Sequence, residues 1–133
     1  VYGCDDCLSV CPWNKFSKTT KEKKFLALEK EKDLKFFLDF DENIFKKYFV
    51  QSPILRIGWT SFIRNILIAS GNSKIQNLRS SVKKYLMHKE PLVRGTAVWS
   101  INKLHQFKKT ELFQKLKTIE KNKYVKFELD CLD

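Results

Sequence analysis

The sequence is poor in residues that interrupt regular structure, and it has no long apolar runs. Its 133 residues include only 4 glycines and 3 prolines, too few for a turn-rich β architecture. No apolar run approaches the roughly 20 residues of a membrane span, and no segment resembles a signal peptide. We therefore expect a soluble, cytoplasmic protein with no membrane partner. Hydrophobic content of 43% and aromatic content of 14% argue against disorder and favour a packed core.

Acidic residues are almost absent from the middle of the chain. Residues 46–109 contain 13 basic residues and a single acid, Glu90, so this segment carries essentially the whole net charge of +11. Such an excess indicates a polyanionic partner, and nucleic acid is the first candidate. The alternative is a solvated lysine-rich face without a partner, because 22 of the 26 cations are lysines.

Cysteine is also scarce, and three of the four cysteines lie in the first 16 residues, VYGCDDCLSVCPWNKF. Cys4, Cys7 and Cys11 are spaced C-x2-C-x3-C-P, the tail of the bacterial ferredoxin run C-x2-C-x2-C-x3-C-P without its first cysteine. The missing ligands would lie on a segment before Val1. We therefore expect the chain to be the C-terminal fragment of a longer iron–sulfur protein.

A structural zinc ion is the alternative occupant of this cysteine run, since C-x2-C with one further Cys or His suits zinc. Iron–sulfur ligation is favoured because the only histidines, His88 and His105, lie far from the run in sequence. Cys131 is isolated near the C-terminus. We expect it to pack among apolar side chains rather than to serve as a fourth ligand.

Apolar periodicity predicts an all-α chain. Asp41 is expected to cap a helix that carries Phe45, Tyr48 and Phe49 on one face, and Ser52 with Pro53 to begin the next helix. That helix should run over 53–70, with Leu55, Trp59, Phe62, Ile66 and Ala69 on its apolar face and Gly71 as its left-handed stop. Further helices are expected over 75–87 and over 124–132. Between them, one helix should begin at Pro91 with Val93, Ala97, Ile101 and Leu104 inward, and another should carry Leu112, Leu116 and Ile119.

The helices form an internal repeat. Pro53 aligns with Pro91 and Arg56 with Arg94, both 38 residues apart, which is the period of HEAT-like helix pairs. We divide the chain into the end of a ferredoxin-like cysteine module (1–16), a connector with capping helices (17–50) and HEAT-like repeats (51–133).

The basic residues nearest the starts of the repeats are candidate phosphate contacts. Arg56 and Arg94 fall in the first turns of their helices, where they could bind phosphate or form an ion pair within the repeat. Arg64 lies eight residues after Arg56 and should point to the same side. Trp13, Trp59 and Trp99 could stack on an unpaired base, but packing is the more common role at helical spacing. The full set of candidate nucleic-acid contacts is Lys46, Lys47, Ser52, Arg56, Arg64 and Arg94.

Three segments together resemble one enzyme family. YGCDDCLSVCPWNKF, SPILRIGWTSFIRNILIASGN and PLVRGTAVWSINKL resemble the C-terminal part of epoxyqueuosine reductase, and the likeness covers nearly the whole chain. The resemblance implies a cobalamin-dependent iron–sulfur oxidoreductase that makes the last step of queuosine synthesis on tRNA. Its parts would be an N-terminal catalytic domain, a two-cluster ferredoxin-like module and a HEAT-like domain.

The resemblance also assigns residues. Cys4 and Cys7 would bind one 4Fe–4S cluster and Cys11 the other, both shared with the missing N-terminal part, while Asp5 and Asp6 would lie close to the cobalamin. The catalytic acid and the cobalamin pocket would precede this chain, so the fragment alone would be inactive and holds no catalytic residue. The implied partners are the tRNA anticodon stem-loop and an external electron donor, and we expect a monomer.

Two other functions fit parts of the sequence. A ferredoxin-type electron carrier of another reductase class would need no RNA, and a HEAT-like protein scaffold would carry a structural zinc. The metal separates the scaffold from the two redox proteins, and RNA affinity separates the reductase from the other carrier.

Overall fold

The computed structural model describes residues 3, 5–22, 32–104 and 107–131, except the side chain of Lys108. Within these residues every regular element is a helix, which confirms the all-α prediction, and none has the length and apolarity that a membrane span needs. The elements are α1 (Asp6–Ser9), η1 (Pro12–Phe16), α2 (Leu34–Leu38), α3 (Glu42–Tyr48), η3 (Pro53–Ile57), α4 (Gly58–Ser73), η4 (Gln76–Leu78), α5 (Arg79–Lys83), η5 (Lys84–Met87), α6 (Pro91–Leu104), η6 (Phe107–Lys109), α7 (Glu111–Ile119) and α8 (Lys123–Asp130), where η marks a 3₁₀ helix.

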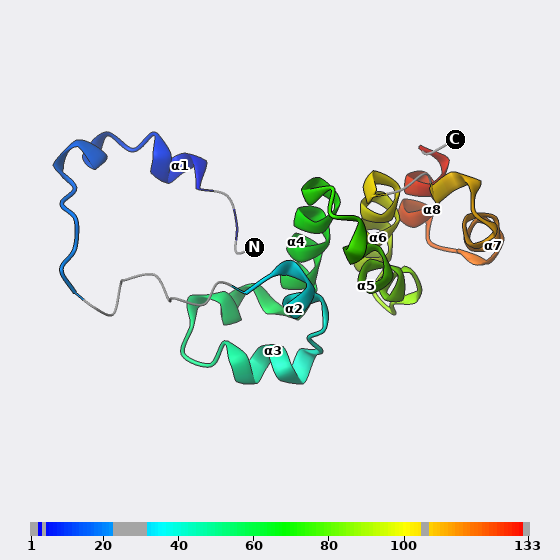
Figure 1. The fold of residues 1–133 in the computed structure, drawn as a ribbon, viewed down its shortest axis with the longest axis horizontal. Helices are drawn as coiled ribbons and strands as arrows, with labels where there is room; N and C mark the ends of the chain where they lie inside the picture. Colours follow the sequence, from blue (N-terminus) through cyan, green and yellow to red (C-terminus); the bar gives the residue numbers. More distant parts are fainter. Residues whose placement is uncertain (1–2, 4, 23–31, 105–106, 132–133) are drawn as a thin grey trace.

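The described chain has a cysteine segment (residues 5–22) and a helical body (residues 32–104 and 107–131). The cysteine segment lies apart from the helical body in Figure 1. Within the body, α4 packs mainly against α6, and α6 packs against α8. This order of neighbouring helices agrees with the 38-residue repeat, whose HEAT-like character and domain boundaries remain predictions.

The core of the body follows the apolar periodicity of α6. Val93, Ala97, Ile101 and Leu104 are all buried, as the sequence predicted. Ser100 lies on the same buried side and donates from its Oγ to the Leu67 carbonyl of α4, at 2.7 Å. That bond joins the two central helices and satisfies a polar group that would otherwise be buried without a partner.

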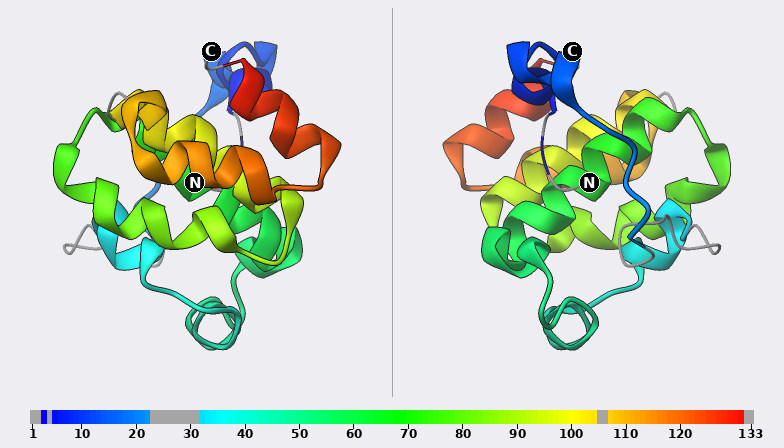
Figure 2. Two further views of the ribbon diagram at one scale, coloured as in Figure 1. Left: turned by 90° about the vertical axis from the view of Figure 1, so that its right-hand side faces the viewer. Right: turned by 90° about the vertical axis from the view of Figure 1, so that its left-hand side faces the viewer.

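Aromatic side chains close one edge of the body, where α3 lies in all three views (Figures 1 and 2). Phe45 of α3 and Phe37 of α2 both contact Phe62 of α4, with ring centroids 4.9 and 5.8 Å apart. The Tyr85 hydroxyl donates to the Leu38 carbonyl at 2.7 Å and ties η5 to α2. These contacts are made by residues of the predicted connector and capping segment (17–50), whose boundaries stay a prediction; residues 23–31 of it fall outside the described part of the chain.

Local capping agrees with the sequence. The Asp41 carboxylate accepts a hydrogen bond from the Ile44 amide at 2.7 Å, and the Ser52 hydroxyl accepts one from the Ile54 amide at 3.3 Å. Each cap satisfies a backbone N–H that has no partner in the first turn. Both predicted helix starts are therefore confirmed.

The helix expected over 53–70 is two elements instead. Pro53–Ile57 forms the 3₁₀ helix η3, and α4 begins at Gly58, whose φ of 72° lies in the left-handed region that favours glycine. This break changes the helix phase, so Leu55 is exposed rather than buried. The buried side of α4 is formed by Phe62, Ile63, Ile66, Leu67, Ser70 and Gly71.

Gly71 does not terminate α4, so its predicted role as the left-handed stop is wrong. The helix continues to Ser73, and Lys74 takes the left-handed conformation, with φ 58°. Gly71 is buried against α6, and a Cβ built on it would lie 2.8 Å from Cζ3 of Trp99. The absence of a side chain permits this close helix contact.

Near the C-terminus, one apolar side chain of a predicted helix is exposed and one further prediction is wrong. Ile119, at the last position of α7, is 43% exposed, and Phe113 is buried in its place together with Leu116. Cys131 is exposed rather than packed among apolar side chains. Both residues sit where a helix ends, so the neighbouring helices do not cover them.

Candidate functional site

The cysteine segment is built around two short turns. Cys7 lies in α1 and is exposed, and Cys11 precedes η1 and is half-buried. The Asn14 side chain donates to the carbonyls of Leu8 and Ser9, at 2.6 and 3.3 Å, which links the two turns. The two thiols are therefore held on a locally hydrogen-bonded segment.

The donor set of this segment fits iron–sulfur chemistry in kind, because soft thiolates suit such centres. Its number of ligands is insufficient: no three Cys, His, Asp or Glu side chains in the described part of the chain are grouped to hold a metal ion. Cys4, the third predicted ligand, falls outside the described residues. Any cluster here would need ligands from Cys4 and from elsewhere.

Acidic and apolar side chains of the cysteine segment face solvent. Asp5 and Asp6, the predicted cobalamin neighbours, are both exposed. Four large apolar side chains are more than 60% exposed on this short segment: Leu8, Val10, Trp13 and Phe16. Such an exposed group is typical of a surface that another part of a protein covers.

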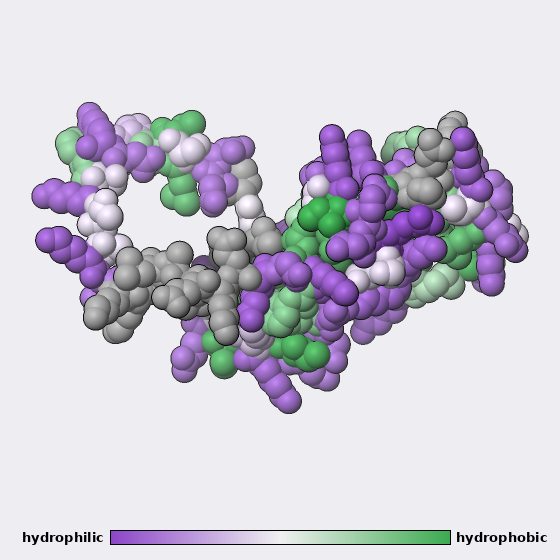
Figure 3. All heavy atoms as spheres, viewed as in Figure 1, coloured by the Kyte–Doolittle hydropathy of each residue, from purple (hydrophilic) through white to green (hydrophobic). Residues whose placement is uncertain are grey.

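The predicted nucleic-acid contacts lie on several elements of the helical body, whose visible face is largely hydrophilic (Figure 3). Lys46 and Lys47 are exposed in the last turn of α3, and Lys46 pairs with Glu42 at 2.8 Å. Ser52 caps η3.

Arg56 and Arg64 are both exposed but stand on different elements, η3 and α4. The prediction that Arg56 and Arg64 point to the same side assumed one continuous helix. Because the helix breaks at Gly58, their spacing of eight residues no longer places them on one side. Arg64 instead points into a cleft between α4, α6 and α8.

Arg94 is engaged inside the protein. Its Nε and Nη2 donate to the two carboxylate oxygens of Glu120, at 2.8 and 2.9 Å, and Nη1 donates to the carbonyls of His88 and Lys89. The Arg94 side chain is 17% exposed and that of Glu120 is 7% exposed. Of the two alternatives for Arg94, the geometry favours the internal ion pair over phosphate binding.

The same ion pair shifts the pKa values of both partners. The hydrogen bond from Arg94 lowers the pKa of Glu120 from 4.5 to about 2, against a rise from burial, and the Asn122 and Lys121 amides lower it further. The pKa of Arg94 is raised by its bond to Glu120. Both groups are therefore charged at neutral pH.

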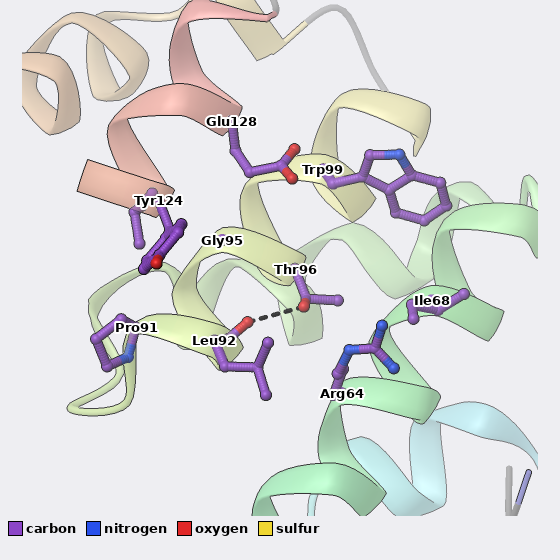
Figure 4. Close-up of a pocket in the computed structure, with 10 residues that line it drawn as sticks. Arg64, Ile68, Pro91, Leu92, Gly95, Thr96, Trp99, Tyr124 and Glu128 are labelled. Atoms are coloured by element: carbon purple, nitrogen blue, oxygen red, sulfur yellow. Dashed lines mark hydrogen bonds between the residues drawn. The ribbon is translucent and has the colours of Figure 1, made fainter. Parts of the chain in front are cut away.

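The cleft between α4, α6 and α8 has a volume of about 410 Å³ (Figure 4). Of its lining residues, only Arg64 and Trp99 were candidate RNA contacts by sequence, because helical periodicity does not reveal which helices lie side by side. Besides these two, the lining residues are Ile68, Pro91, Leu92, Gly95, Thr96, Tyr124, Val125 and Glu128.

Comparison with known proteins relates this helical chain with its cysteine segment to a group of oxidoreductases. The curated relatives that it matches are epoxyqueuosine reductases. It is 41% identical over 108 residues to the one from Francisella cf. novicida, a match that covers 77% of this chain and 30% of the relative. It is 33% identical over 104 residues to the epoxyqueuosine reductase from Escherichia coli. That match covers 76% of this chain and 27% of the relative.

The match to the epoxyqueuosine reductase of Vibrio cholerae is shorter, at 41% identity over 75 residues, 55% of this chain and 20% of the relative. The chain thus spans less than a third of the length of these relatives. The resemblance seen in its motifs is confirmed. No family model matches the chain, and no solved structure matches it.

Proposed function

We propose that this chain is part of an epoxyqueuosine reductase, the enzyme that converts epoxyqueuosine to queuosine in the tRNA anticodon. The observation that supports this most strongly is the 41% identity over 108 residues to a relative of that name. The cysteine spacing and the basic middle segment agree with the two tasks such an enzyme needs, electron delivery and RNA binding.

In this proposal the cysteine segment contributes ligands to two 4Fe–4S clusters. Cys4 and Cys7 would bind one and Cys11 the other, with the remaining thiolates supplied by a segment outside this chain. When bound, such clusters supply electrons one at a time to the cobalamin. The exposed apolar side chains around Cys7 and Cys11 would pack against the catalytic part and exclude water from the centre, and Asp5 and Asp6 would lie beside the cobalamin.

The helical body would hold the anticodon stem-loop. Lys46, Lys47, Arg56 and Arg64 would neutralise phosphates and position the RNA, while the modified base enters the catalytic part. Ser52 would lie beside these contacts. Arg94 is left out of this set because its guanidinium already binds Glu120 and two carbonyls.

The gene that encodes this chain provides the test. Expressed in a bacterium that lacks epoxyqueuosine reductase, its full product should restore queuosine in tRNA, as measured by mass spectrometry of the nucleosides. A Cys11→Ser variant should not restore it, whereas a Cys131→Ser variant should match the wild type because Cys131 is not a proposed ligand. Persistent epoxyqueuosine with the wild-type gene would refute the assignment.

Metal analysis separates the remaining alternatives. Iron and sulfide in the anaerobically purified gene product would support the reductase, and zinc alone would favour the helical scaffold. A cluster-bearing protein with no affinity for an anticodon stem-loop would instead point to an electron carrier of another class.

A further inference from the structure

The cleft between α4, α6 and α8 combines aromatic walls with access to solvent. Its volume of about 410 Å³ falls within the range of small-ligand sites, roughly 300–1,000 Å³. Tyr124 and Leu92 line it and are 69% and 52% exposed, and Trp99 is partly exposed beside them. A flat aromatic ligand could therefore reach a ring without any movement of the core.

Cations from three helices surround these aromatic side chains. Arg64 of α4 points into the cleft (Figure 4). The Lys103 ammonium of α6 lies 5.6 Å from the ring centroid of Trp99, and the Lys123 ammonium of α8 lies 5.0 Å from that of Tyr124. Stacking surfaces interleaved with cations are the chemistry that binds single-stranded nucleic acid.

One acid stands in this basic setting. Glu128 of α8 lies across the cleft from Arg64 (Figure 4), with its Cγ 3.6 Å from the position that a Cβ on Gly95 would take. An ionised carboxylate accepts hydrogen bonds and cannot donate them. The Glu128 carboxylate would repel a phosphate but would accept a hydrogen bond from the amino group of a base. A bound nucleotide would therefore place its phosphate toward Arg64 and its base edge toward Glu128.

We propose that this cleft binds one unpaired nucleotide of the RNA. The base stacks on Tyr124, the Glu128 carboxylate accepts from its amino group, and Arg64 binds its phosphate. Cytosine, adenine and guanine carry such an amino group and uracil does not, so the site prefers the first three. This inference rests on the proposed function, which requires RNA on the helical body, and it adds a base-reading site to that surface.

The stacking role is tested by fluorescence anisotropy of an anticodon stem-loop RNA with the full chain and with its Tyr124→Ala variant. Loss of one stacked base should weaken binding roughly tenfold and leave the dependence on salt unchanged. Phe127→Ala is the matched control, because Phe127 is an aromatic residue of α8, is 65% exposed and lies outside the cleft lining. It should bind like the wild type. Circular dichroism verifies that both variants stay folded.

The base-reading role is tested with short oligocytidine and oligouridine of equal length. The wild type should bind oligocytidine more tightly, and Glu128→Gln should reduce the ratio of the two affinities several-fold. Differences in intrinsic stacking cancel in this comparison of ratios. Glu111→Gln, which removes an exposed acid from α7, should leave the ratio unchanged.

The outcomes separate this inference from the proposed function. If the wild type binds the stem-loop but the Tyr124 and Phe127 variants bind equally, the cleft is not a nucleotide site and the RNA surface lies elsewhere. An unchanged affinity ratio in Glu128→Gln would likewise overturn the base-reading role. If the wild type binds no RNA at low salt, RNA binding by the helical body fails, and this inference fails with it.

Discussion

At the residue scale, the Arg94–Glu120 ion pair carries a stability contribution that depends on pH. The folded-state pKa of Glu120, about 2, lies below its ordinary value of 4.5. The folded protein therefore holds the charged form more tightly than the unfolded chain does. The contribution is fully present above pH 4.5 and is lost as the pH falls through about 2.

We predict that Glu120→Gln lowers the free energy of unfolding by roughly 2–3 kcal/mol at pH 7, because it leaves the Arg94 guanidinium without its charged partner. The difference from wild type should shrink as the pH is lowered from about 5 toward 2. Urea unfolding at a series of pH values measures both effects. Glu111→Gln, an exposed position, should show neither, and a pH-independent difference would contradict the assigned cause.

At the scale of elements, the contact between α4 and α6 depends on a missing side chain. A Cβ on Gly71 would lie 2.8 Å from Trp99 Cζ3 and 3.1 Å from the Ser100 Cα, and the second of these is backbone. Gly95 is also buried in a helix, but a Cβ there would lie 3.6 Å from Glu128 Cγ, an ordinary contact. The two glycines thus differ in what surrounds them.

We predict that Gly71→Ala destabilises the protein by about 1–3 kcal/mol, because the overpacking outweighs the gain of up to about 1 kcal/mol from helix propensity. Gly95→Ala is the matched control and should be neutral or stabilise by up to about 1 kcal/mol. Thermal unfolding of both variants measures the difference. Equal effects of the two substitutions would show that α4 and α6 do not approach closely at Gly71.

At the scale of the whole molecule, the excess of cations in residues 46–109 determines the expected response to salt. Contacts to phosphate release counterions, so affinity falls as salt rises, with a slope set by the number of contacts. The proposed contacts stand on α3, η3 and α4, and α3 and η3 each pack against α4. Their arrangement fits a polyanion that spans more than one helix.

We predict that replacing Arg56 and Arg64 together by alanine reduces the slope of log affinity against log salt for the anticodon stem-loop by about 1–2. The double variant Lys115→Ala, Lys121→Ala removes the same charge from exposed positions outside the basic segment, and it should change the slope little. Binding titrations at several salt concentrations give the slopes. An unchanged slope in the arginine variant would remove both residues from the contact surface.

The sequence alone determined the features that depend on near neighbours in the chain. The caps at Asp41 and Ser52, the buried side of α6 and the all-α class are settled within a few turns, where a cap and its amide or an apolar stripe lie close in sequence. The cysteine spacing and the family resemblance are equally local.

Only the tertiary structure decided which helix faces meet. Arg94 binds the carboxylate of Glu120, 26 residues away and outside the basic segment, so the sequence near Arg94 left phosphate binding and an internal ion pair both open. The sequence predicted Gly71 as a helix end, whereas in the structure α4 continues past it and α6 packs on it. The cleft joins Arg64, Trp99 and Tyr124 from three helices. Periodicity shows that a helix has a face to bury, but the partner of that face depends on how the whole chain packs.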